Sequence, residues 1–192
     1  MITAGVLTYK KTTDPEIRDS LRKLLNTKNT RLVEEFNVEN GISRADIVGI
    51  SNAELHGYEI KSDVDSLTRL ASQVHSYGKV FSRMTLVVGA SHIKQAMYMI
   101  PEWWGVTLAK KDEEGIVVFS QIRKARLNPS LDSSSLLKLL FKEEINVVIK
   151  SNRFINNSST TKTGLSHNLL NQLNDEEIQK AVSASLFRRY CS

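Results

Sequence analysis

RADIV at residues 44–48 and EIK at residues 59–61 are the stretches that decide the fold of this 192-residue chain. Both lie in short, mostly apolar runs, residues 44–50 and 55–61, which predict two strands joined by the polar turn SNAE. A turn centred between Asn52 and Ala53 pairs residues whose numbers sum to 105. This register places Asp46 opposite Glu59, and the two-residue spacing places Lys61 on the same face as Glu59.

The predicted pairing brings two carboxylates together. Carboxylates that face each other across paired strands repel and raise each other's pKa. A divalent cation between Asp46 and Glu59 would remove the repulsion, and hard oxygen ligands favour Mg²⁺ or Mn²⁺ over zinc. Lys61 would then point its ammonium toward an attacking water or a phosphate. The pattern predicts metal-assisted hydrolysis of a phosphodiester, and the alternative is an exposed hairpin face with ordinary charges.

The segment after the second strand, residues 63–82, predicts a helix from Val64 to Phe81. Its apolar residues recur at helical spacing, at Leu67, Leu70, Val74 and Phe81. Gln73 and Tyr77 lie one turn apart on this helix and therefore share a face. The alternative for this pair is an ordinary helix surface with one amphipathic tyrosine.

This order of motifs resembles the PD-(D/E)XK nuclease superfamily. In that superfamily the aspartate lies on the second strand of the core and Glu-x-Lys on the third; Ala45 replaces the usual proline before the aspartate. The Gln73 and Tyr77 pair looks like the extra motif of the RecB-type branch, whose helix lies over the active site. From about residue 14 to WWGV at 103–106, the chain is similar to a small family of such proteins from bacteria and phages.

The resemblance implies a divalent-metal-dependent nuclease. Asp46, Glu59 and the carbonyl of Ile60 would hold Mg²⁺ or Mn²⁺, and Lys61 would position and activate the water. A glutamate on the first helix or first strand often completes such a site, which makes Glu35 the candidate additional ligand.

Two residues of the expected site remain open. Glu34 lies next to Glu35 and points the other way in a strand, so the register alone does not say which of the two faces the site. By the same resemblance, Gln73 and Tyr77 would organise Lys61 or the substrate backbone.

The expected fold class is α/β: a restriction-endonuclease-like core with a mixed central sheet flanked by helices, and a C-terminal helical extension. The core is expected over residues 1–127 and the extension over 128–192, with a polar linker near 151–164. The expected elements are a first helix from Asp14 to Asn26, strands over 32–38, 84–90, 105–111 and 115–125, helices over 92–99 and 133–149, and a helical pair after residue 166. The last two strands are expected as antiparallel additions to the sheet.

The composition of the chain indicates which class of partner to expect. A net charge of +5 and a pI near 9.3 suit a polyanion, so the expected partner is nucleic acid, DNA first, with an RNase or defence effector as a rival. The second rival is a catalytically silent nucleic-acid-binding or protein-interaction module on the same fold. A homodimer is left open.

The expected compartment is the cytoplasm. No apolar run is long enough to span a bilayer, and the N-terminus lacks the pattern of a secretory signal. The single cysteine, Cys191, suits a reducing compartment and excludes the four-cysteine iron–sulfur cluster of some RecB-type nucleases.

Overall fold

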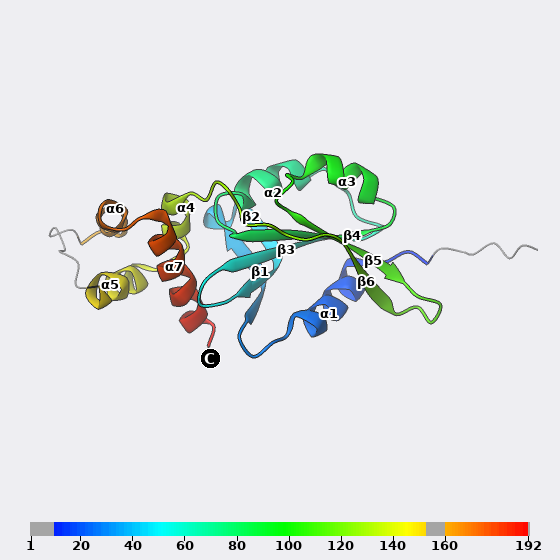
Figure 1. The fold of residues 1–192 in the computed structure, drawn as a ribbon, viewed down its shortest axis with the longest axis horizontal. Coiled ribbons are helices and arrows are strands. Elements are labelled where there is room, and N and C mark those ends of the chain that lie inside the picture. Colours follow the sequence, from blue (N-terminus) through cyan, green and yellow to red (C-terminus); the bar gives the residue numbers. More distant parts are fainter. Residues whose placement is uncertain (1–9, 153–159, 192) are drawn as a thin grey trace, which may run out of the picture.

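A six-stranded mixed sheet, in the order β1 to β6, forms the centre of the fold (Figure 1). The computed structural model describes residues 10–152 and 160–191. The strands are β1 (Arg31–Val38), β2 (Ser43–Ile50), β3 (Leu55–Lys61), β4 (Arg83–Gly89), β5 (Gly105–Lys111) and β6 (Val117–Arg123). The helices are α1 (Asp14–Leu25), η1 (Glu39–Gly41, 3₁₀), α2 (Leu70–Tyr77), α3 (Ile93–Met99), α4 (Ser133–Lys138), α5 (Lys142–Ser151), α6 (Lys162–Gln172) and α7 (Asp175–Arg189). The predicted α/β class is confirmed.

The sheet contains both antiparallel and parallel pairs of strands. β1, β2 and β3 pair antiparallel, β4 is parallel to both β3 and β5, and β6 returns antiparallel to β5. The prediction that both late strands add antiparallel is therefore wrong for β5. Residues 90–104, which contain α3, form a crossover that returns the chain to the same end of the sheet, and such a connection makes the two strands parallel.

The hairpin of β2 and β3 has the predicted register. Ile47 pairs with Tyr58 and Ile50 with Leu55, so the paired numbers sum to 105. The ladder stops at Ile47 and Tyr58, one pair before Asp46 would meet Glu59. The two strands therefore separate where the predicted site begins.

Helices cover both faces of the sheet (Figure 1). α1 packs Ile17 and Leu21 against Ile47, Ile60 and Val87 in a small apolar cluster. A larger cluster on the other face joins α2, α3 and the C-terminal helices α4 to α7 to the sheet. Because side chains alternate along β3, Ile60 lies under α1 while its neighbours Glu59 and Lys61 face the other way. The pattern of β3 thus aims two charged residues toward α2.

Two helices differ from their predicted lengths. The helix predicted over Val64–Phe81 spans only Leu70–Tyr77, because Asp65 accepts hydrogen bonds from the amide and hydroxyl of Ser62 at 2.7 and 2.6 Å and holds a turn there. The helix predicted over 133–149 is divided into α4 and α5, since Phe141 is extended and its amide donates to Glu144 to start α5.

Other predictions about the ends of the chain have mixed outcomes. α1 and the pair α6 and α7 are confirmed, but Thr13, not Asp14, caps α1 through a capping box with Glu16. Half of the predicted polar linker, residues 153–159, lies outside the described residues, and its last three residues begin α6. The predicted domain boundary at residue 127 stays a prediction.

A buried junction follows β3. The carboxylate of Asp63, 5% exposed, accepts hydrogen bonds from the amide and hydroxyl of Thr12 at 2.8 and 2.7 Å and from the amide of Ser91 at 2.9 Å. Gly89 is needed here, because a Cβ at that position would lie 2.5 Å from Asp63 Oδ1. Asp63 therefore joins the segment before α1, the end of β3 and the turn after β4.

Candidate functional site

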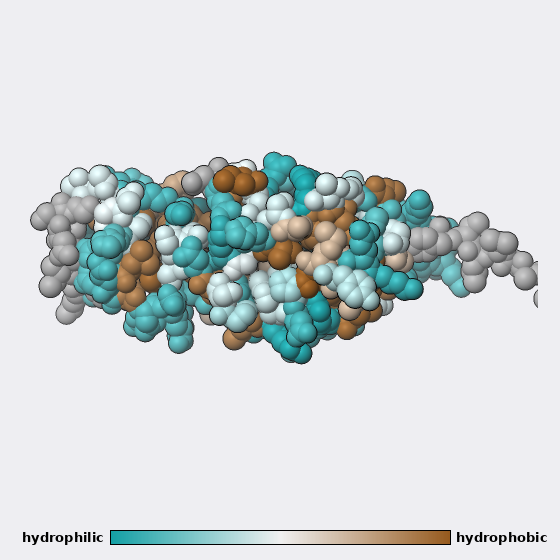
Figure 2. All heavy atoms as spheres, turned by 90° about the horizontal axis from the view of Figure 1, so that it is seen from above, coloured by the Kyte–Doolittle hydropathy of each residue, from teal (hydrophilic) through white to brown (hydrophobic). Residues whose placement is uncertain are grey.

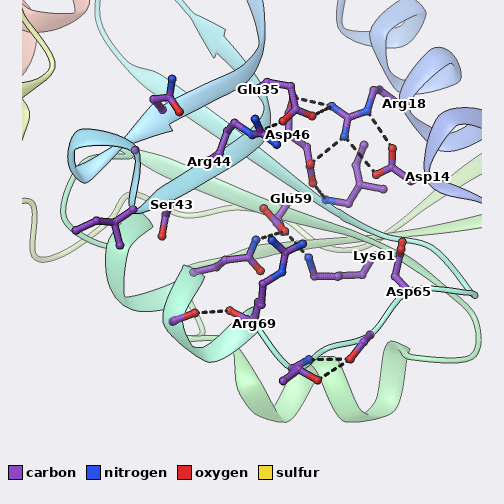
Figure 3. Close-up of a pocket in the computed structure, with 18 residues that line it drawn as sticks. Asp14, Arg18, Glu35, Ser43, Arg44, Asp46, Glu59, Lys61, Asp65 and Arg69 are labelled. Carbon is purple, nitrogen blue, oxygen red and sulfur yellow. Dashed lines mark hydrogen bonds and ion pairs between the residues drawn. The ribbon is translucent and has the colours of Figure 1, made fainter.

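A charged pocket of about 550 Å³ lies where β2 and β3 separate, between α1 and α2 (Figure 3). Its charged lining residues are Asp14, Arg18, Glu35, Arg44, Asp46, Glu59, Lys61, Asp65 and Arg69. Gln73 and the backbone of Ile60 also line it. The structure thus gathers the predicted site residues at one place, and it adds residues that sequence reasoning missed.

Asp46 holds the separated strands together. Its Oδ2 accepts a hydrogen bond from the amide of Ile60 at 2.7 Å, and its Oδ1 contacts Arg18 Nη2 at 2.9 Å. The carboxylate therefore takes the role that a backbone carbonyl plays elsewhere in the ladder. Burial raises the pKa of Asp46, although the Ile60 amide and Arg18 oppose the rise. The register predicted that Asp46 pairs with Glu59 across the ladder, but the ladder ends one pair earlier.

Glu59 is enclosed by side chains. It is 1% exposed; its Oε1 accepts from Lys61 Nζ and from Gln73 Nε2, each at 2.5 Å, and its Oε2 lies 2.9 Å from the hydroxyl of Tyr77. Burial, and after it the nearby charge of Asp46, raises the pKa of Glu59 to about 7. A large part of the Glu59 population is therefore protonated at neutral pH.

Tyr77 links Glu59 to the backbone of β2. Its hydroxyl also lies 2.7 Å from the carbonyl oxygen of Arg44, and it has one proton for these two acceptors. When Glu59 is protonated, Glu59 can donate to the tyrosine oxygen while Tyr77 donates to the Arg44 carbonyl. The network is then fully satisfied, which fits the raised pKa of Glu59.

Arg18 is a cation that the sequence reasoning missed. Its guanidinium contacts the carboxylates of Asp14 at 3.0 Å, Glu35 at 3.1 Å and Asp46 at 2.9 Å. Although burial lowers the pKa of Arg18, the carboxylates of Asp14 and Asp46 raise it above its usual value. The available signal was weak: Arg18 lies four residues after Asp14 on the predicted first helix, but no spacing links it to Asp46.

A break in the β1–β2 ladder turns Glu35 into the pocket. The ladder pairs Glu34 with Ile47 and Phe36 with Ala45 in an unchanged register, so Glu35 and Asp46 form the one pair missing between them, and the φ of Glu35, 53°, lies in the left-handed region. Its carboxylate contacts Arg44 at 2.5 Å in addition to Arg18. Glu34 instead reaches Arg22, at 3.6 Å. The structure therefore places Glu35 at the pocket and Glu34 away from it.

The N-cap residue of α2, Arg69, and Gln73 within the helix are two further pocket residues. Gln73 uses its amide nitrogen on Glu59, while its Oε1 has no hydrogen-bond partner among the described residues. Arg69 lies one helical turn before Gln73, is exposed, and makes no ion pair or side-chain hydrogen bond within the described part of the chain. The four-residue spacing of Arg69 and Gln73 could have revealed it, because such residues share a helix face.

The expected metal ligands are already occupied. All four carboxylate oxygens of Asp46 and Glu59 contact protein donors, and Arg18 and Lys61 supply positive charge to them. Across residues 10–152 and 160–191, no group of three or more His, Cys, Asp or Glu side chains is arranged to hold a metal ion. The donor set thus does not fit Mg²⁺ or Mn²⁺ in this arrangement, and the cofactor stays a prediction that no measurement has tested.

Comparison with known proteins points to a phage family. Residues 13–192 match the family model described as Bacteriophage P4 protein cII. The protein named Protein cII of Enterobacteria phage P4 is 28% identical over 160 residues, which cover 83% of this chain and 59% of that protein. The chain thus spans less than two thirds of that relative's length. No solved structure matches.

These matches overturn the predicted activity. The prediction of an enzyme, a metal-dependent phosphodiesterase acting as a nuclease, is wrong: the matching family and relative are described as a phage protein cII, and neither description names an enzyme. The alternative prediction of an RNase or defence effector is wrong for the same reason. The predictions that the chain is a hydrolase and a metal-binding protein are not supported either. The resemblance is right at the level of a phage family, but no match shows a relationship to PD-(D/E)XK nucleases. No helix among the described residues is long and apolar enough to cross a membrane.

Proposed function

This chain belongs to the Bacteriophage P4 protein cII family, and on that premise we propose that it binds nucleic acid without cutting it. The charged pocket receives the phosphate backbone, and DNA is the first partner to test. The core keeps the restriction-endonuclease-like arrangement as a scaffold for binding. The protein acts in the cytoplasm of the infected cell, where a phage protein meets nucleic acid.

The acids of the pocket do not oppose a phosphate as strongly as their number suggests. Asp14, Glu35 and Asp46 surround Arg18, and Glu59 contacts Lys61. The raised pKa of Glu59 removes part of its charge near neutral pH. The lining holds five acids, Asp65 among them, and four cations, so the formal excess is one negative charge, which the raised pKa of Glu59 reduces. The exposed groups at the rim therefore decide what the pocket attracts.

The observation that carries the proposal is the exposed guanidinium of Arg69 in the pocket lining, which has no partner among residues 10–152 and 160–191. Arg44 lies on another wall of the pocket, on β2, with 62% of its side chain exposed. The hydroxyls of Ser66 and Thr68 line the pocket too. Guanidinium and hydroxyl groups are the side chains that most often contact phosphate oxygens, and the net charge of +5 favours approach of a polyanion.

Fluorescence anisotropy with a labelled DNA strand and its duplex, over a series of salt concentrations, tests the proposal. Arg69→Ala should weaken binding about five- to tenfold near 0.1 M salt and reduce the slope of log affinity against log salt by about one. Arg188→Ala removes an exposed arginine on α7 that does not line the pocket, and this control should leave both quantities unchanged.

Two outcomes would refute the proposal. One is a wild-type protein that binds neither DNA nor RNA at low salt. The other is an equal loss of affinity in Arg69→Ala and Arg188→Ala, because binding would then depend on total charge and not on the pocket. The DNA should be recovered uncut after incubation with Mg²⁺.

A further inference from the structure

We propose that the pocket takes an unpaired base, and that Gln73 Oε1 accepts a hydrogen bond from an N–H on the base-pairing edge of that base. This inference rests on the proposed binding of nucleic acid and specifies its form. It follows from one polar atom that the protein leaves without a partner. Gln73 is 8% exposed and lines the pocket, and its Oε1 is buried with no hydrogen bond among the described residues.

The orientation of the Gln73 amide is determined by its neighbours. Nε2 donates to Glu59 Oε1, which also accepts from Lys61. Oε1 of Glu59 is an acceptor when Glu59 is ionised and also when its proton lies on Oε2, toward Tyr77, so exchanging the amide nitrogen and oxygen of Gln73 would place two acceptors 2.5 Å apart in both states. The oxygen therefore stays on the side away from Glu59. A buried acceptor without a partner costs about 1 to 3 kcal/mol, so a ligand that supplies a donor recovers that cost.

In DNA the hydrogen-bond donors are N–H groups of the bases, since phosphates carry only acceptors; in RNA the 2′-hydroxyl is a further donor. In a duplex the N–H groups of the base-pairing edge are engaged with the opposite strand, and the remaining amino hydrogens lie on the floors of the grooves. A recessed acceptor is therefore reached by a base that is unpaired or turned out of the helix. A pocket of about 550 Å³ lies within the range of sites that hold small molecules.

Arg69 connects the phosphate contact to the base contact. Four residues on a helix span about 6 Å, so Arg69 and Gln73 lie on one face at a spacing comparable to that between the phosphate and the base of one nucleotide. Gln73 Oε1 is covered in this structure, and a ligand reaches it only when a neighbouring side chain moves. Arg69, which points into the pocket in Figure 3 and has no partner in the described part of the chain, can move without breaking a contact. A bound phosphate would draw it aside.

The test compares two single strands that differ by one N–H per base. Oligo-dT offers the N3–H of thymine, and the same strand built from N3-methylthymidine does not. Wild-type protein should bind oligo-dT about three- to tenfold more tightly than the methylated strand, and more tightly than a duplex of equal length. Anisotropy titrations at one salt concentration give both ratios.

Three variants separate the contributions. Gln73→Met keeps the length of the side chain and removes the acceptor, so it should bind both strands equally; a steric effect of the methyl group alone would leave the preference in place. Arg44→Ala should weaken binding to both strands and preserve their ratio. Melting temperatures of the variants identify any that fail to fold, and Gln73→Glu, which keeps an acceptor, should retain the preference if Gln73→Met is unstable.

The outcomes distinguish the two proposals. If no strand binds, the proposed function itself fails. If strands bind but methylation has no effect in the wild type, only the base contact is wrong. A duplex that binds more tightly than either single strand would overturn the unpaired base while leaving backbone binding intact.

Discussion

Two buried carboxylates lie four residues apart at the end of β3, and the protein holds them by different kinds of donor. Glu59 is enclosed by side chains that line a pocket, Lys61 among them. Asp63 accepts from two backbone amides, those of Thr12 and Ser91, and from the hydroxyl of Thr12, all in segments far away in the sequence. Backbone donors from distant segments fix an arrangement of chain, whereas side-chain donors can rearrange around a ligand. Burial of a carboxylate alone therefore does not identify a site; the type of donor does.

The comparison predicts the largest loss of stability at Asp63. Asp63→Ala leaves the donors of Thr12 and Ser91 without an acceptor, and we expect the free energy of unfolding to fall by about 4 kcal/mol. Urea denaturation measures it. Asp65→Ala is the control, because within the described residues Asp65 accepts from Ser62 alone, and its loss should cost about half as much. A loss at Asp63 no larger than at Asp65 would break the contrast between the two regions.

The next effect is a dependence of stability on pH at Glu59. Its pKa is raised from the ordinary 4.5 to about 7, first by burial and then by Asp46. Between these values the folded state binds more protons than the unfolded state, so the free energy of unfolding falls as the pH rises from about 4.5 to about 7. This carboxyl contributes a change on the order of 3 kcal/mol.

Glu59→Gln removes the titrating group and should flatten that fall. Denaturation of wild type and variant at about pH 5 and about pH 7.5 isolates the contribution, since the other groups titrate in both proteins. Parallel curves for the two proteins would show that Glu59 stays ionised and that Lys61 outweighs burial.

A smaller effect concerns the hydroxyl of Tyr77. Tyr77→Phe keeps the ring, which packs against Trp104 and Phe81, and removes contacts to Glu59 and to the Arg44 carbonyl. We expect a loss of about 1.5 kcal/mol in thermal or chemical unfolding. Tyr58→Phe is the matched control and should cost less, because the one hydrogen bond of the Tyr58 hydroxyl in the described part of the chain is to His56, at 3.3 Å. Equal losses would mean that the contacts of the Tyr77 hydroxyl with Glu59 and the Arg44 carbonyl add nothing to the stability of the fold.

The smallest effect separates backbone strain from charge at Glu35. Both Glu35→Gly and Glu35→Ala lose the contacts with Arg18 and Arg44, but only glycine adopts a φ of 53° without strain. Glu35→Gly should therefore be more stable than Glu35→Ala by about 1 kcal/mol in urea denaturation. An equal stability of the two variants would mean that the backbone at residue 35 leaves the left-handed region when the carboxylate is removed.

Local features of the site could be predicted from the sequence. The register of β2 and β3 follows from a short turn and from alternation along each strand, and both are properties of neighbouring residues. The shared face of Gln73 and Tyr77 likewise needs only one helical turn, and both contact Glu59. These predictions required no knowledge of distant segments.

The remaining features depend on distant contacts. The strands separate before Asp46 because Arg18 of α1 and the amide of Ile60 hold that carboxylate, and no pattern in the sequence links residue 18 to residue 46. The left-handed backbone at Glu35 has no glycine that could have indicated it in the sequence. The predicted chemistry was wrong for a related reason: a pair of carboxylates calls for a cation, and the protein itself supplies cations through Arg18 and Lys61.

The short turn between β2 and β3 thereby limits how the family can vary. Residues 51–54 are mostly polar, and Asn52 and Ala53 at the tip are exposed, which is where insertions are usually tolerated. Yet one added residue would shift every pair of the hairpin by one and carry Asp46 away from the Ile60 amide. We therefore expect natural variants of this chain to differ in the residue types of the turn while keeping its length. The length of a surface loop is then constrained by the geometry of a pocket at the opposite end of the strands.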